Sequence, residues 1–316
     1  MLNSTILEVI IGLVFLYLIF SLLATFVNEI ISTFFKLRAN HLKSAIKNML
    51  DNDTEEGEKL FKEFYDHPLI QSFVKKKGKG FPSYLEPKKF AKVIIDIYEK
   101  SKDEDIQNDI KSIIENLPKS NYLKHLLDNY NKGVQKIEDL EKNIEEWFNS
   151  VMDRTSGWYN RNIKKLTLLT ALIIAIAFNF DTIHVYQRLS KDSNSRTELV
   201  LLAENNIDKY AEYVKKDTVN RESDTLLLVE MNKLKTNIKT IIDEEVNSIE
   251  QMAGLGWEKG ECKTTLKNCW SSAFLIKLLG WVLTAMAISL GAPFWFDLLD
   301  KIMKLRGTGK QEKITT

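Results

Sequence analysis

Residues 9–27 read VIIGLVFLYLIFSLLATFV, a stretch of 19 residues without a charged side chain. At about 1.5 Å of rise per residue, a helix of this length covers roughly 28 Å, close to the hydrocarbon core of a bilayer, about 30 Å thick. The stretch predicts a transmembrane helix. Apolar residues resume after Asn28 and Glu29, so we expect one N-terminal membrane helix within residues 1–35. A cleaved secretory signal is the alternative, but residues 1–8 contain no Lys or Arg and no cleavage site follows Val27.

Two further apolar stretches predict membrane helices. The first, Leu166–Phe180, has 15 residues and is also compatible with a buried core helix, although Lys164 and Lys165 precede it as interfacial anchors do. The second, Leu278–Phe296, has 19 uncharged residues, with Trp281 and Trp295 placed as an aromatic belt. With their flanks, we expect these helices within residues 166–187 and 273–299.

The distribution of charge predicts the sidedness of the chain. The 316 residues carry 44 Lys+Arg and 43 Asp+Glu, but residues 36–165 have a net charge of +3, residues 190–272 of −3 and residues 300–316 of +3. Because cytoplasmic flanks are enriched in Lys and Arg, we expect residues 36–165 and a basic tail, residues 300–316, in the cytoplasm. The N-terminus and residues 188–272 are then expected outside.

Both polar segments show helical rather than strand periodicity. Leu42, Ile46 and Leu50 recur at a spacing of four in the first segment, which predicts a helical cytoplasmic domain. In the second, an amphipathic run over 199–214 precedes a stripe with spacings of 4, 3, 4 and 3, formed by Leu227, Met231, Leu234, Ile238 and Ile241. The predicted fold class is therefore an all-α membrane protein with three transmembrane helices, a helical cytoplasmic domain and a helical extracytoplasmic hairpin.

Cys262 and Cys269 lie in the segment expected outside, where a disulfide persists. A continuous helix would hold them about 10.5 Å apart, beyond the roughly 7 Å that a disulfide bridges. We therefore expect a turn between them and a disulfide, with two unrelated thiols as the alternative.

Signatures of catalysis and of metal binding are absent from the sequence. It contains no P-loop, G-x-G-x-x-G, H-E-x-x-H or G-x-S-x-G string, and its four histidines have no second ligand at metal spacing. The near-neutral charge gives no argument for nucleic acid as a partner. The cluster Lys75–Lys79 has three readings: a nucleic-acid contact, a contact with anionic lipid, or a solvated loop. We expect a protein that is not an enzyme and has no cofactor.

Polar residues near membrane depth are the other candidates, because burying them in lipid is costly. They are Asn28, Glu29, Asn179 and Asp181. They are either the solvated ends of the spans or groups that line a polar path against another helix or subunit.

Several strings resemble an uncharacterised family of bacterial membrane proteins. The most specific are EEWFNSVMDRTSGWYNR (residues 145–161) and LGAPFWFDLLDKIMKLRG (residues 290–307). The resemblance implies the bacterial inner membrane and no particular substrate. The mixture of aromatic and charged residues in these strings predicts contacts with the membrane interface. The expected interface residues, with Trp281 added, are Trp147, Phe148, Trp158, Tyr159, Arg161, Phe294 and Trp295.

These observations favour an anchor or scaffold in the lipid bilayer, whose cytoplasmic domain binds a protein partner and which can form a homo-oligomer. The first alternative is an oligomeric pore lined by Asn28, Glu29 and Asn179. The second is an enzyme that works from the cytoplasmic domain.

Overall fold

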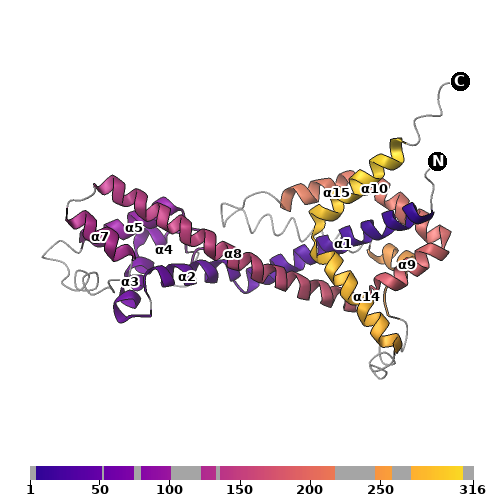
Figure 1. The fold of residues 1–316 in the computed structure, drawn as a ribbon, viewed down its shortest axis with the longest axis horizontal. Coiled ribbons are helices and arrows are strands. Elements are labelled where there is room, and N and C mark those ends of the chain that lie inside the picture. The colour runs from indigo at the N-terminus through magenta and orange to yellow at the C-terminus, as the bar shows by residue number, and fades with distance from the viewer. Residues whose placement is uncertain are drawn as a thin grey trace. The chain divides into compact units, whose positions relative to one another are not determined.

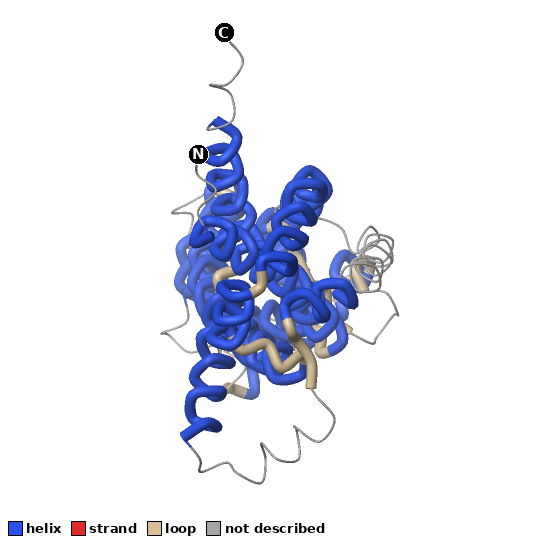
Figure 2. The backbone as a smooth tube through the Cα atoms, turned by 90° about the vertical axis from the view of Figure 1, so that its right-hand side faces the viewer, coloured by secondary structure: helices blue, strands red, loops and turns tan. Residues whose placement is uncertain are grey.

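The computed structural model describes residues 5–51, 53–74, 80–100, 122–132, 136–217, 246–257 and 272–308. All regular elements in these ranges are α-helices, which confirms the all-helical class for this part of the chain (Figures 1 and 2). The chain divides into two compact units. Unit 1 contains Met1–Ile31 and Ile163–Thr316, and unit 2 contains Ser32–Asn162.

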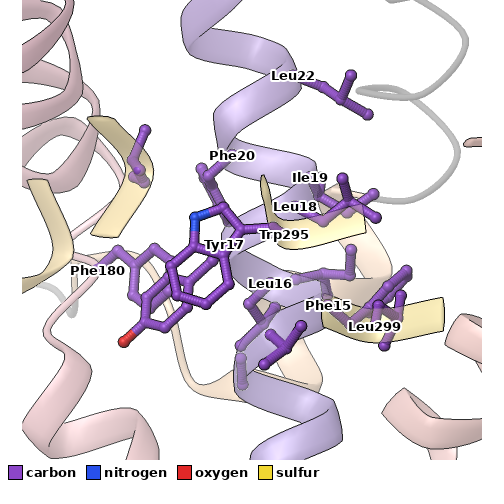
Figure 3. Packing of buried hydrophobic residues seen from close by; sticks show 14 of the residues in the cluster. Phe15, Leu16, Tyr17, Leu18, Ile19, Phe20, Leu22, Phe180, Trp295 and Leu299 are labelled. Atoms are coloured by element: carbon purple, nitrogen blue, oxygen red, sulfur yellow. The ribbon is translucent and has the colours of Figure 1, made fainter. Parts of the chain in front are cut away.

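Helix α1 (Thr5–Phe34) lies at the centre of unit 1. Every residue from Val14 to Ala24 is buried, so this apolar stretch is enclosed by other helices of the same chain (Figure 3). Among the described helices, α1 alone is long and apolar enough to cross a bilayer, and up to three spans result if each of two bent helix pairs counts as one. The structure therefore indicates a membrane protein, whereas the specific three-span topology stays a prediction.

The first bent pair consists of α8 (Ile137–Ala177) and α9 (Thr182–Lys191), which meet at 51°. Asn179 adopts a left-handed backbone conformation with φ of 48°. The N–H of Phe180 donates to the carbonyl of Ala175 at 2.7 Å, and that of Asn179 to Ile176 at 3.1 Å. This pattern is a Schellman motif, which ends α8 inside the predicted second span.

The second bent pair consists of α14 (Ser272–Ser289) and α15 (Ala292–Thr308), which meet at 89°. Gly291, with φ of 90°, provides the turn between them because a side chain is strained in this conformation. Pro293 lies in the first turn of α15, where its missing N–H costs nothing.

Helix α10 (Ser193–Asp217) packs against α15 and α9 and touches α1 where Leu199 lies near Gly12, and α12 (Asn247–Ala253) packs against α9 and α10. The buried face of α10 consists of Leu199, Val200, Ala203, Tyr210 and Val214. The rings of Tyr210 and Phe15 lie 5.8 Å apart. The predicted helix over 199–214 is thus present, but it covers the apolar centre of unit 1. The stripe from Leu227 to Ile241 lies outside the described residues.

Unit 2 is a helical domain with its own core. Its helices are α2 (Leu37–Met49), α3 (Glu55–Asp66), α4 (Pro68–Gln71), α5 (Pro87–Lys100), α7 (Tyr122–Asn131) and the first part of α8. Phe90 is fully buried, with its ring 5.3 Å from that of Phe64 and 4.8 Å from that of Phe148. Apolar residues at helical spacing therefore face inward from α3, α5 and α8.

Candidate functional site: a hydrogen-bonded junction in unit 1

The predicted polar residue Asn28 joins α1 to α8. Its Nδ2 donates to Thr167 Oγ1 at 3.0 Å, and its Oδ1 accepts from Thr170 Oγ1 at 2.6 Å. Both atoms of the amide are therefore engaged within the chain. Hydrogen bonds between helices in membrane proteins contribute about 0.6 kcal/mol each on average, so this pair fastens two helices together.

Asp181 lies at the break between α8 and α9 and is 7% exposed. Its Oδ1 accepts from the backbone N–H groups of Ile183 at 2.8 Å and His184 at 3.3 Å, which makes it the N-cap of α9. The carboxylate packs directly on α14 at Gly280, where a Cβ atom would overlap it. The glycine thus makes room for the cap.

A chain of hydroxyl groups continues from this break to α1 and α14. The hydroxyls of Tyr17 and Thr182 share a hydrogen bond of 2.9 Å, and those of Thr182 and Thr284 share one of 2.7 Å. Thr284 Oγ1 also accepts from the N–H of Thr182 at 3.2 Å and donates to the carbonyl of Phe180 at 2.8 Å. We call Tyr17, Asp181, Thr182 and Thr284 the junction, because they connect α1, α9 and α14.

The turn after α12, at Gly256 and Trp257, forms hydrogen bonds with the residues at the break between α8 and α9. Asn179 Nδ2 donates to the carbonyl of Gly256 at 2.8 Å, and the N–H of Gly256 donates to the carbonyl of Phe178 at 2.7 Å. Trp257 Nε1 donates to the carbonyl of Ile176 at 2.9 Å. The backbone groups that the break exposes are thereby paired, as buried polar groups require.

Aromatic rings surround the junction. The ring of Tyr17 lies 4.6 Å from that of Trp295 and 5.8 Å from that of Phe180, with which it stacks (Figure 3). Trp295 is 8% exposed and donates from Nε1 to the carbonyl of Ala287 at 2.7 Å, and Trp281 is 5% exposed. The sequence placed both tryptophans at the membrane interface, but the 89° turn of α14 into α15 and the packing on α9 bury them in the protein instead.

The other predicted interface residues are distributed unevenly. Phe148 is buried and Trp147 half-buried, because both pack around Phe90 in the core of unit 2. Trp158, Arg161 and Phe294 are exposed, and Tyr159 is half-buried. The aromatic residues before the second span therefore follow helical periodicity, with one face in the domain core.

Two ion pairs lie toward the N-terminal end of α1. Arg196 donates from Nε to Glu8 Oε2 at 3.0 Å and from an Nη atom to the carbonyl of Leu189 at 2.9 Å. Arg306 at the end of α15 donates to Glu204 of α10 at 2.6 Å. The charge pattern predicts opposite sides of the membrane for Glu204 and Arg306, whose side chains are in contact here.

The junction holds helices together and contains no pairing of a nucleophile with a base. Within the part of the chain that the structure describes, no group of three His, Cys, Asp or Glu side chains is arranged to hold a metal ion. Cys262, Cys269 and Lys75–Lys79 lie outside the described residues. Sequence reasoning missed Tyr17, Thr182, Thr284 and Gly280. The string FNFD, with Asn suited to the left-handed C′ position and Asp to the N-cap, was the signal for the break.

No protein-family model, no curated protein and no solved structure matches this chain.

Proposed function

We propose that the chain crosses the membrane twice, through α1 and through the bent pair α8–α9, and that α14–α15 is a re-entrant V. In this topology the second arm of the V returns toward the side of the α1 N-terminus. The contact between Arg306 and Glu204, together with the pair Glu8–Arg196, supports one common side for these segments. A re-entrant turn is tolerated at membrane depth where protein covers its backbone. Here Gly291 is half-buried and Ala292 is buried, while the side chains of Leu290 and Phe294 face outward.

Exposed apolar side chains mark the surface of unit 1 that faces lipid. Large contiguous apolar patches are rare on soluble proteins. On α8 and α14 the exposed apolar residues are Leu168, Leu169, Ile173, Ile176, Leu275, Ile276, Leu278, Leu279, Val282, Leu283 and Met286. Such a belt is stable only against a bilayer or another apolar surface.

The orientation follows from the flanks of the two complete crossings. Residues 36–165 contribute Lys36, Arg38, Lys43, Lys47, Arg154, Arg161, Lys164 and Lys165 near the spans. The opposite flanks contribute Arg188, Lys191 and Arg196. For the two complete crossings taken alone, the positive-inside rule favours unit 2 in the cytoplasm, as expected from the sequence. The re-entrant V then takes the basic residues Lys301, Lys304 and Arg306 at the end of α15 to the outer side, against the same rule.

We propose further that the protein is an inner-membrane anchor or scaffold that holds unit 2 at the membrane for a protein partner. The observation that carries this proposal is the continuity of α8. This helix supplies Leu140, Ile144 and Phe148 to the core of unit 2, and Ala171 and Ile174 to the core of unit 1. An anchor needs a connection between the membrane unit and the domain, and α8 provides it as one helix that contributes to both cores.

An exposed aromatic group on unit 2 is the proposed contact with the partner. Tyr122 is 50% exposed, stacks on His125 at 6.4 Å and lies 5.6 Å from the ring of Trp147. Tyrosine and tryptophan are enriched among residues that dominate binding energy at protein interfaces.

The test places a photo-crosslinking amino acid at position 122 of the full chain in living cells. A matched control places it at Lys142, whose side chain is 75% exposed. We expect one protein adduct from position 122 and none from position 142. Absence of an adduct at either position, together with a monomer after gentle detergent extraction, would contradict the scaffold.

The pore alternative is weaker because its proposed lining is engaged elsewhere. Asn28 bonds to Thr167 and Thr170, and Asn179 bonds to the carbonyl of Gly256. A pore lined by these side chains requires that those bonds break. Single-channel recording in liposomes tests it, and a conductance that Asn28→Leu changes would revive this function.

A further inference from the structure

Unit 2 contains a pocket of about 290 Å³ that neither the anchor function nor the partner contact uses. It lies between the start of α2, the segment before α5 and the middle of α8. Its lining residues include Arg38, His41, Tyr84, Met152, Ser156 and Tyr159.

The chemistry of the lining suits an anionic amphiphile. Arg38 and His41 line the pocket, and among the described residues its lining contains no Asp or Glu. Ser156 and Tyr159 contribute hydroxyl groups to the lining, and Leu42, Phe148 and Met152 contribute apolar surface. Arginine with neighbouring hydroxyls is a common arrangement for binding phosphate.

The wall of the pocket is held in place by contacts within unit 2. The rings of His41 and Tyr159 meet edge to face at 4.9 Å. The hydroxyls of Tyr159 and Ser32 lie 3.4 Å apart. These contacts orient the side chains before a ligand arrives, which lowers the entropic cost of binding.

The residues that line the pocket are also close in sequence to the predicted membrane spans. Arg38 follows the end of α1, Phe34, by four residues, and Tyr159 precedes the apolar run at Leu166 by seven. Along the continuous helix α8, seven residues correspond to about 10 Å. About 10 to 15 Å of a bilayer's total thickness lies outside its hydrocarbon core, which is about 5 to 8 Å on each side, so this separation reaches just past one headgroup layer.

We propose that this pocket binds the phosphate headgroup of an anionic phospholipid from the surrounding bilayer. Arg38 contacts the phosphate, the hydroxyls of Ser156 and Tyr159 donate to its oxygens or to the headgroup, and the apolar wall covers the first carbons. The size of the pocket is near the lower limit for ligand sites, so the acyl chains remain in the membrane. The lipid thereby becomes a specific ligand of unit 2.

The test is native mass spectrometry of the full chain released from nanodiscs that contain equal amounts of phosphatidylglycerol and phosphatidylcholine. We expect the wild type to retain one phosphatidylglycerol in preference to phosphatidylcholine. Arg38→Gln should weaken this retention about tenfold, because a hydrogen bond to a charged group is lost. Ser156→Trp, at an exposed position, should fill the pocket and have a similar effect without disturbing the core.

Lys43→Gln is the matched control, since Lys43 is an exposed cation on the same helix α2 that does not line the pocket. Retention should be unchanged in this variant. Equal losses in Arg38→Gln and Lys43→Gln would overturn the proposal in favour of a diffuse surface charge. Displacement of the lipid by glycerol phosphate at the same concentration would overturn it in favour of a soluble phosphate ligand. Unaltered retention of phosphatidylglycerol in both Arg38→Gln and Ser156→Trp would show that the lipid does not bind in this pocket.

Discussion

Replacement of Gly280 by alanine tests the packing of the junction. A Cβ atom at this position would occupy the space of the Asp181 carboxylate, which caps α9. Loss of an N-cap costs about 1 kcal/mol, and leaving a buried N–H without a partner costs about 1 to 3 kcal/mol. Replacing glycine by alanine within a helix stabilises the helix by about 1 kcal/mol, because alanine has the higher helix propensity. We therefore expect Gly280→Ala to destabilise unit 1 by about 1 to 2 kcal/mol.

The effect of Gly280→Ala on stability should have the opposite sign when the Asp181 cap is already absent. In an Asp181→Ala background the carboxylate no longer competes for the space, so Gly280→Ala should stabilise the protein by about 1 kcal/mol. The coupling energy between the two positions is then about 2 to 3 kcal/mol. Gly157, which has no heavy atom within 4 Å of an added Cβ, is the control. Gly157→Ala should behave alike in both backgrounds.

The assay is unfolding of the full chain by SDS in mixed micelles, followed by tryptophan fluorescence. Replacing Trp147 and Trp158 by phenylalanine removes the tryptophan signal of unit 2, so the remaining described tryptophans, Trp257, Trp281 and Trp295, report on unit 1. Additive effects of Asp181→Ala and Gly280→Ala, with no change of sign, would refute the reasoning.

Three further outcomes follow from contacts elsewhere. Asn28→Leu should lower the stability of unit 1 by about 1 kcal/mol in the same assay, since two interhelical hydrogen bonds are lost. An effect below measurement error would show that these bonds do not fasten α1 to α8. Arg196→Gln should cost about 2 kcal/mol, because the partly buried Glu8 loses its partner, while Lys191→Gln at an exposed position should be neutral. In unit 2, the hydrogen bond from His67, followed by the nearby Lys100, lowers the pKa of Asp96 from its usual 3.8. A carboxyl group whose pKa is lowered in the folded protein contributes stability when the pH is above its usual pKa of 3.8. This contribution is lost as the pH falls below that value. Asp96→Asn should therefore lower the melting temperature followed by circular dichroism at pH 6, with a difference that shrinks toward pH 3, and a difference independent of pH would contradict this origin.

Much of the helical architecture was predictable from local pattern. The first span was evident because 19 uncharged apolar residues have few alternatives in a folded protein. Helical periodicity also predicted the helix over 199–214. The periodicity did not show what the apolar face of that helix covers, because amphipathicity does not distinguish a hairpin partner from a neighbouring membrane helix.

The breaks in the second and third apolar runs escaped prediction for a different reason. Hydropathy is averaged over a window of residues, so it does not detect a helix break that depends on two capping residues, Asn179 and Asp181. Hydropathy predicts Asn179 and Asp181 at the polar end of a span, yet together they end one helix and begin another. Gly291 carries the second turn.

The junction itself was out of reach of sequence reasoning. Tyr17, Thr182 and Thr284 are separated by more than 100 residues in the chain and meet only through tertiary packing. The burial of Trp281 and Trp295 was likewise out of reach, because the residues that cover them, such as Trp257 and Tyr17, come from other parts of the chain. The aromatic belt itself stays a prediction.

Sidedness of single cysteines in intact spheroplasts is the most direct test of the proposed topology. In a variant without Cys262 and Cys269, cysteines are placed one at a time at Ser190, Lys304 and Lys142, which are exposed positions in α9, α15 and unit 2. An impermeant maleimide should label Ser190→Cys and Lys304→Cys in intact spheroplasts, and Lys142→Cys only after lysis. Labelling of Ser190→Cys before lysis but of Lys304→Cys only after it would restore three complete spans and contradict the re-entrant V.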